Sequence, residues 1–283
     1  MEKTRFNAYD EIMKRINEAL ASGTAPWHRP WVIRPECIVS HNKGRPYSLR
    51  NRMMLSYAGE YATFHQVKQE GGSVNKGAKS KMVFFAKYVD KKNENGEVID
   101  SYHCLRAFLV FHIQDTTLEP KYKDKWGGQR PPEGVPMDIA RSYSERAAVR
   151  WLDGGNRAFY SPTDDTIQVP SFTDFECIEE YWSTVFHELA HSTAKRLCRR
   201  IGDAFGSSSY AKEELVAEIT AALCLGRLGI DTESTALNSA AYIDNWRKKI
   251  NNMKAKDFND ACRFAESACG FIFGDKDTNN DDE

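Results

Sequence analysis

Residues 181–197 read YWSTVFHELAHSTAKRL and contain the pentapeptide HELAH. The run is expected to be helical, and on a helix His187 and His191 project from one face, where both rings can bind one metal ion. Glu188 lies about 100° around such a helix, so it can take a proton from a water at the metal instead of binding the metal. The spacing predicts a single-metal site of the zinc-metallopeptidase type.

The rest of this helix supports that placement. Thr173 and Glu176 have the spacing of a capping box, which predicts a long helix from Thr173 to about Cys198. There are two alternatives to a metal site. The pentapeptide can be a chance HExxH, which is expected in roughly 1% of chains of this His and Glu content, or the two histidines can be core residues bonded to the backbone. Apolar residues form a stripe opposite the histidines, which the helix is expected to bury. They are Ile178, Trp182, Val185 and Leu189.

A third metal ligand is expected downstream, where no histidine follows His191. The run YAKEELVAEI offers Glu214 as a ligand and Glu218, one turn on, as the carboxylate that holds a ligand histidine by its other ring nitrogen. Glu213 is the competing ligand, since one residue rotates the helix face by about 100°. Ordinary solvation is the alternative for Glu213 and Glu218, and a surface position is the alternative to an oxyanion-stabilising role for Tyr210.

Composition is that of an ordinary globular chain, 41% hydrophobic and 28% charged over 283 residues. No stretch approaches the roughly 18 apolar residues of a membrane span, and the charged N-terminus lacks the apolar core of a secretory signal, so a cytoplasmic location and no membrane partner are expected. The seven cysteines form no CxxC pair, which favours reduced core thiols.

Charge and pattern predict two modules in an α+β fold. Residues 1–90 carry 15 Lys and Arg against 8 Asp and Glu, whereas the rest of the chain is acidic. A helix over 8–21 and strands over 81–89 and 105–113 predict a small N-terminal α+β domain with an antiparallel sheet. Later helical patterns predict a mostly helical second domain with a small sheet. The predicted boundaries are a first domain at 1–120, a linker at 121–137, a second domain at 138–274 and a disordered acidic tail at 275–283.

The second half of the chain resembles the zincin-like metallopeptidase domain of the ArdC-type antirestriction proteins. One departure is Ser192, directly after the second histidine, where relatives often have tryptophan, and we expect it to alter the cleft wall without touching the ligands. The matching pieces are GGNRAFYSPTDDTIQVP (154–170), the HELAH helix, YAKEELVAEITAALC (210–224) and AAYIDNWRKKI (240–250).

The first half is similar to the N-terminal domain of the same family, which is also found on plasmid primases and binds single-stranded DNA. The matching pieces are PWHRPW (26–31), KGRPYSLRN (43–51), FHQVKQEGGSVNKGAKS (64–80) and VFHIQ (110–114).

A single-strand binder needs cations for phosphates and flat rings for bases. Lys76 and Lys79 are the best candidates, because the glycine between them lets the backbone approach a phosphate closely. Ordinary surface lysines and a local core of prolines and tryptophans are the alternatives. The remaining predicted DNA-binding residues are Lys81, Arg45, Arg50, Arg52, Tyr47, Trp27 and Trp31, with His28 as a further stacking ring.

The resemblance implies a role on mobile DNA, in which the protein shields incoming DNA from host restriction during conjugation or phage entry. The expected cofactor is Zn²⁺, with Mn²⁺ or another divalent metal as an alternative, and the expected partners are single-stranded DNA and a restriction-system or other protein substrate. A non-catalytic protein that coats single-stranded DNA around a structural or vestigial metal site is the main alternative. DNA mimicry is disfavoured by the net charge of −1, and a primase role by the lack of a primase-like catalytic segment.

Overall fold

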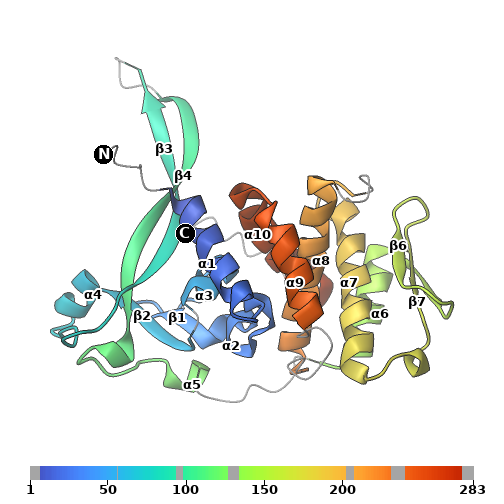
Figure 1. Ribbon diagram of the computed structural model, residues 1–283, viewed down its shortest axis with the longest axis horizontal. Coiled ribbons are helices and arrows are strands. Elements are labelled where there is room, and N and C mark those ends of the chain that lie inside the picture. The colour runs from blue at the N-terminus through green and yellow to red at the C-terminus, as the bar shows by residue number, and fades with distance from the viewer. Residues whose placement is uncertain are drawn as a thin grey trace.

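The computed structural model of the chain describes residues 7–55, 57–93, 98–126, 134–201, 207–230 and 240–275. It confirms the predicted α+β class, with a sheet-containing N-terminal part followed by a mostly helical C-terminal part (Figure 1). Except for Asp275, the predicted acidic tail lies outside the described residues, as does part of the predicted linker. The domain boundaries stay a prediction.

The N-terminal part is built around a four-stranded sheet in the order β1-β2-β4-β3. The predicted antiparallel pairing holds for β3 with β4, and β2, which the sequence did not predict, also pairs antiparallel with β4, whereas β1 pairs with β2 in parallel. A capping box formed by Thr63 and Gln66 begins α4. The elements are α1 (Ala8–Ala21), η1 (Pro26–His28), α2 (Pro30–Ile33), η2 (Pro35–Cys37), β1 (Ile38–Ser40), α3 (Leu49–Leu55), β2 (Gly59–Thr63), α4 (Phe64–Gln69), β3 (Lys81–Lys92), β4 (Val98–His112), η3 (Ile113–Asp115) and α5 (Lys123–Trp126).

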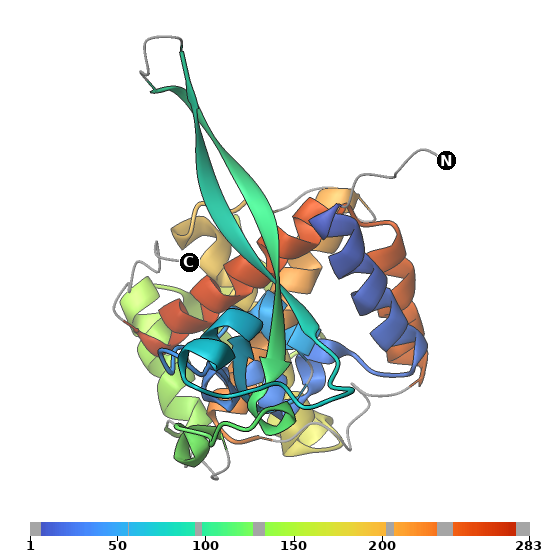
Figure 2. The same ribbon diagram turned by 90° about the vertical axis from the view of Figure 1, so that its left-hand side faces the viewer.

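Strands β3 and β4 form a long antiparallel hairpin whose register runs from Lys81 opposite Val110 to Lys92 opposite Val98. The two views in Figures 1 and 2 show the far end of this hairpin reaching away from the rest of the molecule. Its base is anchored, because Val83, Phe84 and Val110 are buried.

The C-terminal part places a three-stranded sheet, in the order β5-β7-β6, against helix α7. Helix α8 packs along α7, and α10 contacts both helices. The helices and strands are α6 (Pro136–Ala147), β5 (Arg150–Asp153), β6 (Phe159–Ser161), β7 (Thr166–Val169), η4 (Phe172–Asp174), α7 (Ile178–Arg196), α8 (Ser208–Arg227), α9 (Ala240–Asn251) and α10 (Ala255–Phe273).

Helix α1 joins the two parts. Its residues Ile12, Ile16 and Leu20 repeat every four positions and are at most 2% exposed. The helix contacts α9 and α10 of the C-terminal part as well as α3 of its own. Full burial of each such side chain contributes about 1.5–3 kcal/mol. The buried apolar core is therefore continuous from one part to the other.

Two details of the predicted helices are wrong. The capping box at Thr173 does not form: Thr173 lies in the short 3-10 helix η4, and α7 begins at Ile178 after an N-cap, Cys177, that makes no side-chain cap bond. Ile178 is consequently at the solvated end of the helix and is 50% exposed, although the other members of its stripe are buried. Among the helices of the described residues, none has the length and apolarity needed to cross a membrane.

Candidate metal centre

Helix α7 carries the HELAH residues as predicted. Glu179 and Glu180 lie in its first turn and Lys195 and Arg196 in its last, which matches the helix dipole at both ends. Val185 and Leu189 are fully buried and fix the helix rotation. The opposite side is thereby turned toward α8 and the sheet, where the functional side chains converge.

Three side chains place potential metal-ligand atoms within 4.8 Å of one another: His187, His191 and Glu214. The two Nε2 atoms are 3.2 Å apart. The Glu214 carboxylate oxygens lie 3.9 Å from His187 Nε2 and 3.5 Å from His191 Nε2. Metal–ligand bonds of about 2.0–2.1 Å in a tetrahedral arrangement put ligand atoms roughly 3.4 Å apart. The donor set therefore fits one small divalent cation.

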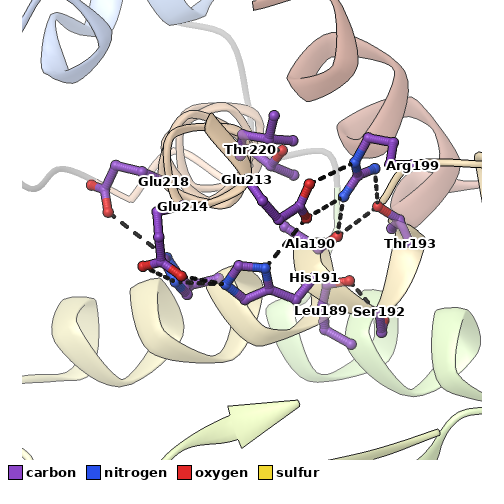
Figure 3. A network of polar contacts seen from close by, with 12 residues as sticks. Leu189, Ala190, His191, Ser192, Thr193, Arg199, Glu213, Glu214, Glu218 and Thr220 are labelled. Carbon is purple, nitrogen blue, oxygen red and sulfur yellow. Dashed lines mark hydrogen bonds and ion pairs between the residues drawn. The ribbon is translucent and has the colours of Figure 1, made fainter. Parts of the chain in front are cut away.

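Glu213, the competing ligand, lies on the other side of the His191 ring (Figure 3). Its Oε1 is 3.3 Å from His191 Nδ1, and Arg199 donates to both of its oxygens over 2.8 and 3.1 Å. Arg199 also donates to Thr193 and to the Ala190 carbonyl, so this cluster links α7, the following turn and α8. A carboxylate on Nδ1 fixes the ring and leaves Nε2 for a metal.

Glu218 takes the corresponding place beside the other histidine. Its Oε2 is 3.8 Å from His187 Nδ1, longer than the 3.3 Å between Glu213 and His191 Nδ1 and beyond hydrogen-bonding distance. Glu214 thus lies beside both Nε2 atoms. Glu213 lies on the Nδ1 side of His191, and Glu218 lies on the Nδ1 side of His187. The sequence predicts Glu218 for this position but offers Glu213 only as the competing ligand, because the EE pair gives no indication of which carboxylate faces which ring.

The carboxylates favour positive charge at the centre. Burial and the neighbouring His191 lower the pKa of His187 to about 4. Burial alone would lower the pKa of His191 too, but hydrogen bonds with Glu213 and Glu214 outweigh it and raise that pKa to about 9. Burial would likewise raise the pKa of Glu214, yet His191 holds it near 2. With these pKa values His187 is neutral near pH 7, whereas His191 carries a proton that a divalent cation displaces when it binds between the carboxylates.

Glu188 faces a cavity of about 370 Å³ beside the cluster. Burial raises its pKa to about 7, against a smaller lowering by His191, so the group is poised near neutral pH as a general base should be. The cavity is walled by α7, by Tyr210 and the two glutamates of α8, and by Phe159 and Tyr160 of β6. Burial and Glu214 raise the pKa of Tyr210, which keeps its hydroxyl protonated.

Ser192 does not line this cavity, so the expectation that it alters the cleft wall is wrong. It is fully buried on the other side of α7, where its hydroxyl lies 2.7 Å from that of Tyr143 and donates to the Leu189 carbonyl.

Comparison with known proteins finds a matching family model for each of the two parts of the chain. A family model described as a zincin-like metallopeptidase matches residues 140–263, and one described as the N-terminal domain of anti-restriction factor ArdC matches residues 6–111. The crystal structure of the antirestriction ArdC protein from the R388 plasmid superposes with a TM-score of 0.71 at 25% identity, over 95% of this chain and 98% of that one. The chain belongs to the ArdC-type antirestriction family.

Two further comparisons bear on this ArdC-type chain. The Mn(II)-bound structure of the same R388 protein superposes with a TM-score of 0.69 at 25% identity, over 97% of this chain and all of that one. That relative therefore binds a divalent metal ion. A DNA primase, TraC of Escherichia coli, is 30% identical over 271 residues. That match covers 86% of this chain but only 18% of the primase, so this ArdC-type chain corresponds to a small part of it.

The predicted DNA-contact residues separate into two groups. Lys76, Lys79 and Arg45 are exposed, and the Lys81 ammonium lies 5.7 Å from the ring centre of Tyr57, itself 64% exposed. Sequence reasoning missed Tyr57, which no motif marks.

The expectation that Trp27, Tyr47, Arg50 and Arg52 contact DNA is wrong, because these side chains are at most 9% exposed. Arg52 donates to the carbonyls of Val32 and Tyr47, and Arg50 to that of Phe84, so both guanidiniums hold the fold together. The backbone of Trp31 lies in α2, and its side chain lies outside the described residues.

His28 is also buried, so it is not a stacking ring for DNA either. The ring of Trp27 beside it packs edge-on against Trp246 of α9, at 5.8 Å between centroids. The PWHRPW segment therefore belongs to the contact between the two parts of the chain.

Proposed function

We propose that this chain protects incoming DNA from restriction in the cytoplasm of the receiving cell, by combining a single-stranded-DNA-binding surface with a metal-dependent peptidase site. His187, His191 and Glu214 bind the metal, and Glu188 is the catalytic base. The convergence of these four side chains on one cavity carries the proposal. Two imidazoles and one carboxylate suit Zn²⁺, and the Mn(II) found in the R388 relative makes Mn²⁺ the second candidate.

The chemistry follows from the positions of the residues. A bound divalent cation would polarise a scissile carbonyl and lower the pKa of a water. Glu188 accepts the proton of that water and delivers it to the leaving amine, for which a pKa of about 7 is well placed. Tyr210, whose raised pKa keeps it protonated, lines the same cavity and donates to the developing oxyanion.

The substrate is a polypeptide in extended conformation. Strand β6 is at the edge of the three-stranded sheet and also forms a wall of the cavity. An extended peptide can add to such an edge through main-chain hydrogen bonds, which place its carbonyls along the strand. The partly exposed Phe159 ring on β6 offers an apolar contact for a substrate side chain.

Single-stranded DNA binds at the N-terminal part through the exposed cations. Lys76 and Lys79 flank Gly77, whose φ of +89° turns the backbone between them. Lys81 beside the exposed Tyr57 ring adds a cation and a flat surface for a base. Arg45 adds a further exposed cation.

The test compares Glu188→Gln with the double substitution Lys76→Gln/Lys79→Gln in cells that receive unmodified plasmid DNA into a restricting host. The proposal predicts that Glu188→Gln abolishes protection while metal content and DNA affinity stay at wild-type values. If Glu188→Gln protects fully and only the lysine variant fails, the chain protects by coating DNA and the peptidase proposal is wrong.

A further inference from the structure

In the described part of the chain, one side chain of the N-terminal part, that of His28, reaches the metal centre. His28, the last residue of η1, is 6% exposed and lies against α8 and α9. Its Nε2 is 3.3 Å from a carboxylate oxygen of Glu218 and 3.0 Å from the hydroxyl of Tyr242. This histidine comes from the part of the chain that matches the ArdC N-terminal domain, not from the zincin-like part.

Glu218 is the junction of these contacts. Its Oε1 accepts from the Tyr242 hydroxyl and lies beside His28, while its Oε2 faces His187 Nδ1. The side chain is 11% exposed, so its charge depends on protein donors more than on water. With one oxygen held by two donors, the other is fixed in direction toward the His187 ring.

We infer that His28 is a positioning residue for the metal centre: together with Tyr242 it holds Glu218 against His187 Nδ1, and so keeps His187 Nε2 directed at the cation. The inference rests on the metal site of the proposed function. It makes metal affinity in the C-terminal part depend on a segment of the N-terminal part.

The two metal-binding histidines are thus supported differently. His191 is held by Glu213 and Arg199, both from the zincin-like part. His187 has the Glu218 carboxylate 3.8 Å from its Nδ1, and Glu218 is in turn contacted by a residue from each part of the chain. Packing of Trp27 on Trp246 keeps η1 in place. A shift of η1 would therefore affect His187 through two contacts, that of His28 with Glu218 and that of Glu218 with His187.

The size of the effect follows from this geometry. Loss of a partner that orients a metal-bound histidine typically lowers metal affinity by 10–100-fold. His28 acts one contact farther out, and Tyr242 remains as a second donor to Glu218. We therefore expect the lower end of that range, about tenfold, for removal of the His28 donor.

The experiment measures Zn²⁺ affinity of the full chain by competition with a chromophoric chelator, and the visible absorption spectrum of the Co²⁺-loaded protein. His28→Leu keeps the approximate size and removes the donor, whereas His28→Gln restores an N–H near the position of Nε2. His65→Leu is the matched control, because His65 is an exposed histidine of the N-terminal part. His187→Ala reports on the metal site itself.

The inference predicts about tenfold weaker Zn²⁺ binding and an altered Co²⁺ spectrum for His28→Leu, recovery to within about threefold for His28→Gln, and no change for His65→Leu. Wild-type affinity and spectrum in His28→Leu overturn it. Equal weakening in both His28 variants, with equal loss of thermal stability in chelator, also overturns it, because packing would then be the cause. If wild type binds no Zn²⁺, or His187→Ala binds it unchanged, the proposed metal site itself fails.

Discussion

The metal centre and the basic surface of the N-terminal part are held in place in different ways. At the centre, each histidine ring lies beside a carboxylate that other buried groups fix in turn, so the side chains have little freedom. At the surface, Lys76 and Lys79 are exposed on a turn, and their positive charge matters more than their orientation. Single substitutions should therefore have large effects at the centre and small, additive effects at the surface.

The largest expected effect is on catalysis. Glu188→Gln keeps the shape of the side chain but cannot take a proton, so we expect peptide cleavage to slow by about 10²–10⁴-fold with metal content unchanged. Turnover of fluorogenic peptides by matched, metal-loaded preparations measures this. Cleavage at the wild-type rate would show that Glu188 is not the catalytic base. It would also contradict the expectation that single substitutions have larger effects at the metal centre than at the basic surface.

The next effect is on stability. Arg199 is 2% exposed and donates to Glu213, so Arg199→Met takes the guanidinium from a buried carboxylate and leaves it the His191 ring alone. We expect the free energy of unfolding to fall by about 3–5 kcal/mol. Urea denaturation in the presence of chelator gives this value. The adjacent, exposed Arg200 is the control, and Arg200→Met should change stability by at most about 0.5 kcal/mol. Equal losses for both variants would contradict the picture of a specifically buried network.

A pH-dependent effect is expected where the sheet meets α7. Arg196, which donates to both oxygens of Asp165, lowers the pKa of that carboxyl. The stability from this pair is therefore present above the ordinary pKa of an aspartate and is lost as the pH falls through the lowered value. Asp165→Asn should cost about 1.5–3 kcal/mol at pH 7, and the difference from wild type should shrink as the pH falls below the ordinary pKa of an aspartate.

Urea denaturation across this pH range measures that difference. Asp174→Asn, at an exposed aspartate, is the control and should track wild type at every pH. A gap between Asp165→Asn and wild type that stays constant as the pH falls would show that the lost stability does not come from the charge of this carboxyl.

The smallest effect is at the surface. Lys76→Gln/Lys79→Gln removes two phosphate contacts, and we expect the slope of log affinity for single-stranded DNA against log salt to flatten by about 1.4. Titration of a labelled oligonucleotide at several salt concentrations measures the slope. Lys248→Gln, at a 75% exposed lysine of α9, is the control and should leave the slope unchanged. An unchanged slope in the double variant would show that single-stranded DNA binds at another surface of the protein.

Sequence reasoning worked where one element carries the whole signal. The spacing of His187 and His191 and the periodicity of α1 are local, so both were predicted correctly as helix faces. The HELAH helix began later than predicted because the capping box at Thr173 was not used. The short strands β1, β2 and β5 were missed, because a few residues carry too little pattern.

Reasoning failed where packing between distant segments decides. The charge of Arg52 is visible in the sequence and predicts a DNA contact, whereas its carbonyl partners are set by the fold. The same reason hid the contact of His28 with Glu218, 190 positions apart in the chain.

The most direct test of the central claim is the metal content of the purified chain, by elemental analysis after saturation with Zn²⁺ and desalting. The account predicts about one zinc per chain in wild type and in His65→Ala, and essentially none in His187→Ala or Glu214→Ala. A wild-type chain that retains no metal, or a His187→Ala chain that retains a full equivalent, would contradict it.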